Sequence, residues 1–147
     1  NIFIQLKMIY NSTYNDIEKD IETDNILGKK FGLIKSIRLN GIGSKRLIVN
    51  ELSHGFKKII DQKNDLIYSN IEIRKKGIIV YIAEGQKRFT WVIPFYKLII
   101  YKTPTFSIHA EGNYINYSNS LNRKENLLFF KKIMEHKLNF TKHNHII

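Results

Sequence analysis

Residues 66–118 decide the fold and read LIYSNIEIRKKGIIVYIAEGQKRFTWVIPFYKLIIYKTPTFSIHAEGNYINYS. They contain short runs rich in Ile, Val, Tyr, Phe and Thr, the residues that strands favour. The predicted strands are 66–74, 78–83, 88–93, 96–101, 106–110 and 114–118. Turn residues separate them at hairpin spacing, which is too short for crossover helices, so the pairing should be antiparallel. We therefore predict a bent antiparallel sheet of about six strands.

Alternation within these runs predicts which side chains are buried. Side chains two positions apart share a face of a strand. The predicted core positions are Ile71, Ile73, Phe89, Trp91, Ile93, Phe106, Ile108 and Ala110. His109 alternates out of this set and should lie at the surface or an edge. Pro94 lacks an amide donor and should mark a bend, a bulge or an edge.

Two amphipathic helices are predicted to pack on the sheet. Apolar residues recur at a spacing of four after Ser44, a predicted N-cap, so we expect a helix over 45–62. Gly55 inside it indicates close packing on another element. The second helix should begin at Asn122, with a capping-box partner at Glu125. It should run to Leu138 and bury Leu127, Phe130, Ile133, Met134 and Leu138. The fold class is α+β.

The N-terminal part is less regular. Ile2, Ile4, Leu6 and Met8 predict a strand over 2–9. Residues 11–25 suit either a weak helix that begins at Thr13 or Asn15 or a mobile arm. A further strand is predicted over 31–39. We divide the chain into an N-terminal segment, one α+β domain and a frayed tail, with the boundaries 1–28, 29–140 and 141–147.

Charge is distributed unevenly along the chain. Residues 1–28 hold two basic and five acidic residues, a net charge of −3, whereas residues 29–147 hold 22 basic and 8 acidic residues, a net charge of +14. This asymmetry indicates a polyanionic partner, or an acidic arm that folds back over its own basic body. The alternative, which we favour, is a self-repelling surface enlarged by the codon bias of an AT-rich genome.

Several function classes lack their residues or motifs. The chain has no cysteine, which excludes thiol chemistry and fits a reducing compartment such as the cytoplasm. No run reaches the length of a transmembrane helix. The five histidines show no ligand spacing, and the acidic residues suggest no catalytic pair, so we expect neither metal, cofactor nor enzyme activity. The loop 40–46 fits a glycine turn before a capped helix better than a phosphate site.

Basic residues next to aromatic ones suggest one further class. The interleaving in 87–91 and 96–102 is compatible with stacking of bases on a sheet, although core burial of Phe89 and Trp91 is the favoured interpretation. The candidate anion-binding or nucleic-acid-binding residues are Lys45, Arg46, Lys57, Lys58, Lys75, Lys76, Lys87 and Arg88.

A sheet followed by a helix resembles the pleckstrin-homology-like architecture, in which a bent meander is closed by a C-terminal helix. The stretches FTWVIPFYKL at 89–98 and FSIHA at 106–110 are similar to small bacterial proteins without assigned function. This resemblance covers roughly residues 66–138 and implies a binding scaffold rather than a catalyst. The helix expected over 45–62 departs from the usual order, and no lipid-binding motif of that architecture is matched.

These observations lead to one functional hypothesis and one alternative. The first is a non-catalytic module that engages a protein or peptide through a sheet edge or its basic surface. The alternative is sequence-nonspecific binding of nucleic acid through the basic residues, which would weaken steeply with salt.

Overall fold

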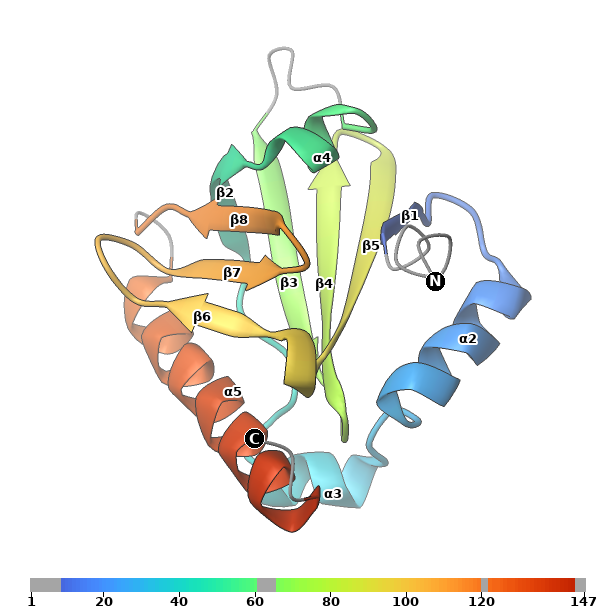
Figure 1. Ribbon diagram of the computed structural model, residues 1–147, viewed down its shortest axis with the longest axis vertical. Coiled ribbons are helices and arrows are strands. Elements are labelled where there is room, and N and C mark those ends of the chain that lie inside the picture. The colour runs from blue at the N-terminus through green and yellow to red at the C-terminus, as the bar shows by residue number, and fades with distance from the viewer. Residues whose placement is uncertain (1–8, 61–65, 120–121, 145–147) are drawn as a thin grey trace.

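The computed structural model describes residues 9–60, 66–119 and 122–144. Strands and helices follow one another along these ranges, with one 3₁₀ turn, η1 (Figure 1). In chain order they are β1 (Ile9–Asn11), α2 (Ile17–Leu27), α3 (Leu33–Arg38), β2 (Leu47–Leu52), α4 (His54–Lys57), β3 (Ile67–Ile73), β4 (Gly77–Glu84), β5 (Lys87–Pro94), η1 (Phe95–Lys97), β6 (Ile99–Tyr101), β7 (Ser107–Ala110), β8 (Asn113–Tyr117) and α5 (Arg123–Asn144).

The strands form one antiparallel sheet in the order β1-β5-β4-β3-β2-β8-β7-β6. The α+β class and the antiparallel pairing are therefore confirmed. Over the described residues the sheet has 8 strands, however, and not about six. The six predicted runs became β3 to β8, and the additional strands β1 and β2 come from the N-terminal half of the chain.

Strand β2 divides the sheet into two halves. Its first residues, Leu47 and Ile48, pair with β3, and its later residues, from Val49 to Leu52, pair with β8. The register shifts between Val49 and Glu51, which bends the strand. As a result β6, β7 and β8 cross the direction of β3, β4 and β5 steeply (Figure 1).

Helix α5 completes the core between the two halves. Phe129, Phe130 and Ile133 are buried, and the ring of Phe130 stacks on that of Phe106 with centroids 4.4 Å apart. The buried stripe of this helix was predicted in part wrongly, because Leu127 and Leu138 are 48% and 55% exposed. The helix is rotated relative to the expected phase because the aromatic residues take the core positions.

The prediction of a helix over 45–62 is wrong. Its described part, residues 45–60, forms β2 and the short helix α4, and residues 61–62 lie outside the described residues. Ser44 caps no helix, because its hydroxyl accepts a hydrogen bond from the Ile71 amide at 2.9 Å. Backbone pairing with two separate strands outweighs the local spacing of four. Gly55 was interpreted correctly, since a Cβ there would stand 2.1 Å from the Asn113 side chain.

The prediction of a strand over 31–39 is also wrong. Residues 33–38 form α3, a helix of 6 residues. Leu33, Ile34 and Ile37 then fall on one side of a helix, because Ile37 lies four residues after Leu33 and three residues after Ile34. This side faces away from the core.

The N-terminal segment lies on the sheet. Ile9 begins β1, which pairs with β5, whereas the remaining positions of the strand expected over 2–9 lie outside the described residues. The predicted weak helix is α2, and its N-cap is Asp16, whose carboxylate accepts from the Lys19 amide. It therefore begins after Thr13 and Asn15. Thr13 instead binds the backbone of Arg88.

Most predictions made from strand alternation are confirmed. Phe89, Trp91 and Ile93 are buried, as are Ile71, Ile73, Ile108 and Ala110. Phe106 is partly buried against the same core. Pro94 ends β5 and precedes η1, so the chain bends there as expected. Helix α5 continues to Asn144, past the predicted end at Leu138.

We expect Gly77→Ala to destabilise the fold. A Cβ at position 77 would lie 2.2 Å from the Ile93 carbonyl oxygen and 2.6 Å from a methyl group of Leu27. Because a backbone atom blocks the space, the sheet must shift, and we expect a loss of roughly 2 kcal/mol or more. Denaturant unfolding of the two proteins measures it.

The matched control is Gly43→Ala, because no heavy atom lies within 4 Å of the added Cβ. It should change the free energy of unfolding by less than about 0.5 kcal/mol. Equal stability of the two variants would contradict the close approach of β4, β5 and α2.

Candidate functional site

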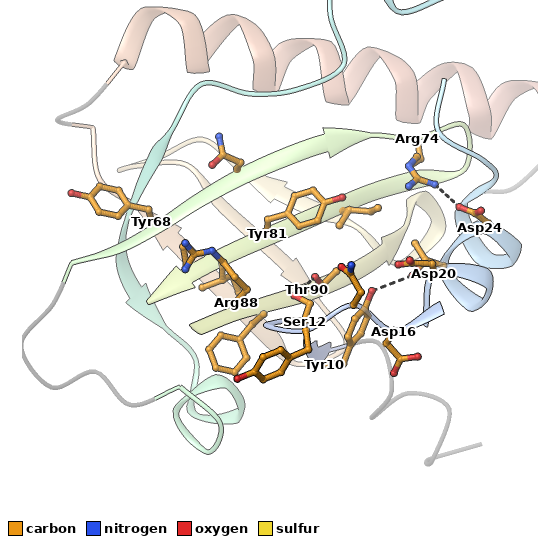
Figure 2. A pocket seen from close by; sticks show the side chains of 18 residues that line it. Tyr10, Ser12, Asp16, Asp20, Asp24, Tyr68, Arg74, Tyr81, Arg88 and Thr90 are labelled. Carbon is orange, nitrogen blue, oxygen red and sulfur yellow. Dashed lines mark hydrogen bonds and ion pairs between the residues drawn. The ribbon is translucent and has the colours of Figure 1, made fainter. Parts of the chain in front are cut away.

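A hollow of about 460 Å³ lies over the outer face of the sheet (Figure 2). Its floor is formed by β3, β4 and β5, and its wall by α2 and the residues around β1. Its volume is in the range of small-molecule and side-chain binding pockets. The lining carries four tyrosines, three aspartates and two arginines. They are Tyr10, Tyr14, Tyr68 and Tyr81, Asp16, Asp20 and Asp24, and Arg74 and Arg88, and all but Tyr14 are labelled in Figure 2.

Strand register places the floor side chains in rows. Asn70, Tyr81, Thr90 and Tyr10 are neighbours on adjacent strands, and so are Tyr68, Ala83 and Arg88. All of them alternate with the buried core positions of their strands, so they face outward. The Thr90 hydroxyl donates to the Ser12 hydroxyl at 2.7 Å, which ties the N-terminal segment to the floor.

Helix α2 covers only one end of this outer face. Leu27 packs with Ile79 and Val92 in a small buried cluster at its C-terminal end. Each such buried side chain contributes roughly 2 kcal/mol. Further along the helix the Thr23 hydroxyl lies 3.5 Å from that of Tyr10. The hollow therefore exists because the helix is held at its end and along one edge.

Arg74 closes the end of the hollow near Leu27. Its guanidinium contacts Glu72 at 2.7 Å and Asp24 at 3.0 Å, and it donates to the Gly28 carbonyl at 2.8 Å. Burial acts to lower the pKa of Arg74, but the hydrogen bonds to Glu72 and Asp24 outweigh it and raise the pKa. The acidic segment is thus folded back onto the basic body, one of the alternatives that its charge left open.

Cations gather at the opposite end. Arg88 is held in place because its guanidinium donates to the carbonyls of Gly85 and Lys87 at 2.7 and 2.9 Å. Arg46 lies over the ring of Tyr68, 4.7 Å from its centroid. Figure 2 shows Tyr68 and Arg88 on one side of Tyr81, and Asp20 and Asp24 on the other.

The middle of the hollow contains polar groups with no partner. Within the described residues, neither the Tyr81 hydroxyl nor the Asp20 carboxylate makes a hydrogen bond or ion pair. Burial, and next the charge of Glu72, raise the pKa of Tyr81 to about 12. Tyr81 is a neutral hydroxyl donor at physiological pH, and the charge of Asp20 is among those that act on it.

The hollow is therefore suited to a ligand that carries both signs of charge. Asp16 and Asp20 attract a cation on the α2 side, and Arg88 attracts an anion at the other end. Between them the tyrosine rings offer surface on which aliphatic or planar groups can pack. Asp24 is already neutralised by Arg74.

The eight basic residues predicted as an anion site do not form one cluster. Arg46 and Arg88 share a surface depression with Tyr68. The turn with Lys75 and Lys76 and the turn before Lys87 lie at opposite ends of β4, which has 8 residues. At about 3.3 Å per residue these turns are roughly 25 Å apart. Lys45 precedes β2, and Lys57 and Lys58 lie at the end of α4.

Sequence reasoning missed most of the lining. Tyr68, Tyr81 and Arg74 alternate with core positions and could have been recognised as the outer face. Nothing local indicated that α2 packs over them, because its contact with β4 and β5 joins residues distant in sequence. Arg46 and Arg88 were identified for their charge alone.

The outer edge of β6 is a second exposed surface. This strand ends the order of the sheet, and its side chains Ile99 and Tyr101 are 50% and 52% exposed. Tyr101 packs edge-on against His109, which itself stacks on Tyr114. His109 is half-buried, which lowers its pKa. It lies on the outer face as predicted.

Comparison with protein-family models, curated proteins and solved structures finds no match for this chain. In the described ranges, no helix has the length and apolar character needed to cross a membrane. Within the same ranges, no three His, Cys, Asp or Glu side chains form a group that could hold a metal ion. The inferences below therefore depend on the geometry of this chain.

We expect Arg74→Met to loosen α2 from the sheet. The substitution retains the aliphatic stem but removes the contacts to Glu72, Asp24 and Gly28. Loss of charged hydrogen bonds at a largely buried side chain should cost about 2 kcal/mol. Denaturant unfolding gives the loss, and amide hydrogen exchange should be fastest in α2.

Lys30→Met is the matched control. Lys30 also faces Glu72, at 3.5 Å, but its side chain is 66% exposed. An exposed ion pair contributes little, so stability and exchange in α2 should be nearly unchanged. A similar loss from both variants would contradict the role of Arg74 in positioning α2.

Proposed function

We propose that this protein is a non-catalytic binding module that holds a polar protein segment or peptide in the hollow beside α2. The observation that carries the proposal is that one concave surface holds two polar groups without a partner among the described residues, Tyr81 and Asp20, together with a fixed cation, Arg88. A basic side chain of the peptide lies toward Asp16 and Asp20. An acidic side chain lies toward Arg88.

The size and chemistry of the lining support a peptide. A volume of about 460 Å³ accommodates a few side chains, and the floor offers hydroxyl, amide and aromatic groups in rows. Arg74, at the closed end, is occupied by its own ion pairs and holds the wall in place. The groups that remain open are therefore the ones that recognise the ligand.

We also propose that the architecture is pleckstrin-homology-like. The strand order supports this, because one strand, β2, is shared by two crossed halves and α5 follows the last strand. The apparent departure, a long helix over 45–62, does not exist. A solved structure of this chain compared with that architecture is the direct test.

We expect peptides that contain both Lys and Glu to bind and to perturb the amide NMR signals of Tyr10, Tyr81 and Arg88. Asp20→Asn and Arg88→Gln should each weaken binding about tenfold, because each removes one charged contact. Fluorescence polarisation with labelled peptides of mixed, acidic and basic composition measures the affinities.

Glu18→Gln and Lys87→Gln are the matched controls. They remove the same charges from neighbouring positions on α2 and β5 that do not line the hollow. Affinity should remain within about twofold. The proposal is wrong if no mixed peptide binds at low salt, or if hollow and control variants behave alike.

The edge of β6 is a second candidate for peptide binding. Beside it, the Lys137 ammonium of α5 donates to the Leu98 carbonyl, and α5 leaves Leu138 exposed. An extended peptide added to β6 would lie near the exposed Ile99 and Tyr101 side chains of this strand. In the same titrations, Ile99→Lys should weaken binding only if the peptide occupies this edge.

A further inference from the structure

Helix α3 presents three large aliphatic side chains to solvent. Leu33, Ile34 and Ile37 are 78%, 70% and 67% exposed. They lie within one arc of the helix, since 100° per residue places them less than a third of a turn apart. A contiguous exposed apolar surface of this kind marks an interaction site more often than a scattered single residue does.

Positive charge surrounds these side chains. Residues 28–46 contain six basic residues and no acidic one. Lys29, Lys35 and Arg38 are exposed beside the aliphatic residues, and Lys30 is also exposed although it reaches Glu72. We call the set 29–38 the α3 surface.

Helix α5 adds to the same region. The Lys132 ammonium donates to the carbonyls of Asn40 and Gly41 at 2.8 and 3.2 Å, so α5 lies against the loop after α3, as Figure 1 shows. Burial lowers the pKa of His136, and the charges of Lys132 and Lys35 lower it further, whereas the charge of Glu135 acts in the opposite direction. The basic groups of α3 and α5 are therefore close together.

We propose that the α3 surface docks on an anionic lipid bilayer. The lysines and arginine lie at the anionic headgroups, and Leu33, Ile34 and Ile37 enter the boundary with the acyl chains. A bilayer of this kind contacts both the positive charges and the aliphatic side chains of the surface. A second copy that docked through the same surface would bring like charges together, and a nucleic acid would leave the aliphatic side chains in water. This surface is separate from the peptide site and does not depend on it.

Helix α2 provides an internal comparison. It exposes Ile17 and Ile21, at 74% and 55%, but these lie among Glu18, Asp20 and Glu22. An anionic bilayer repels that face. The two helices thus offer exposed aliphatic residues of similar size in surroundings of opposite charge.

Vesicle sedimentation with the full chain tests the proposal. We expect binding to vesicles that contain phosphatidylglycerol and none to pure phosphatidylcholine, with weaker binding as salt increases. The triple variant Leu33→Ser, Ile34→Ser, Ile37→Ser should lower the partition coefficient at least about tenfold. The matched variant Ile17→Ser, Ile21→Ser should leave it unchanged.

A second measurement reports insertion directly. Ile34→Trp places an indole at the centre of the α3 surface, whereas the native Trp91 is 2% exposed and reports the intact core. Emission of the new indole should shift to shorter wavelength with anionic vesicles. Circular dichroism of each variant should match that of the parent protein.

Three outcomes would overturn the proposal. One is the absence of binding to anionic vesicles at low salt. Another is equal vesicle binding by the triple variant, which would mean that charge alone acts. The third is a dimer in light scattering, or an oligonucleotide complex, that the parent forms in place of vesicle binding.

Discussion

The structure depends on the pairing of β2 with two different strands. Its backbone is hydrogen-bonded to β3 over Leu47 and Ile48 and to β8 beyond the register shift at Val49. Without this shared strand, the meander of β3 to β5 and that of β6 to β8 would be two small sheets, each with one face left in water. The bend in β2 brings their inner faces together around Phe56, Trp91 and Tyr117. Helix α5 then fills the space that the crossed halves leave open.

The segment before β2 determines which part of the outer face of the sheet is covered and which part remains open as the hollow. Helix α2 reaches the sheet through Leu27 and through the Asp24 contact with Arg74, both near the same end. The rest of the face keeps its tyrosines accessible. The acidic N-terminal segment and the basic remainder of the chain thus form two sides of one hollow. The carboxylates lie on the side of α2, and the guanidinium groups lie on the side of the strands.

The same connection between α2 and β2 carries α3. The chain must travel from the outer face at Leu27 to the start of β2, and it does so over the end of the molecule where α5 also lies (Figure 1). Phe31 and Ile42 pack against the core, whereas Leu33, Ile34 and Ile37 between them do not. This segment is anchored at its ends and open at its centre.

The hairpins from β3 to β8 could be predicted because their information is local. Alternation in 88–93 and the two residues between Glu84 and Lys87 determine both the buried face and the turn. The sequence also indicated that α5 is amphipathic, but it did not indicate which of its apolar side chains face the core. Which of Leu127 or Phe129 enters the core depends on the shape of the space beside Phe106.

By itself, the sequence determined the antiparallel class, the core parity of Trp91 and its neighbours, the final helix and the asymmetry of charge. Tertiary structure alone decided that 47–52 is a strand, that 33–38 is a helix and that Arg46 and Arg88 meet near Tyr68. The physical reason is the distance along the chain over which each interaction acts. Turns and alternation act over a few residues, whereas β2 gains its hydrogen bonds from partners about 20 and 65 residues away in the chain, and that pairing overrides local spacing.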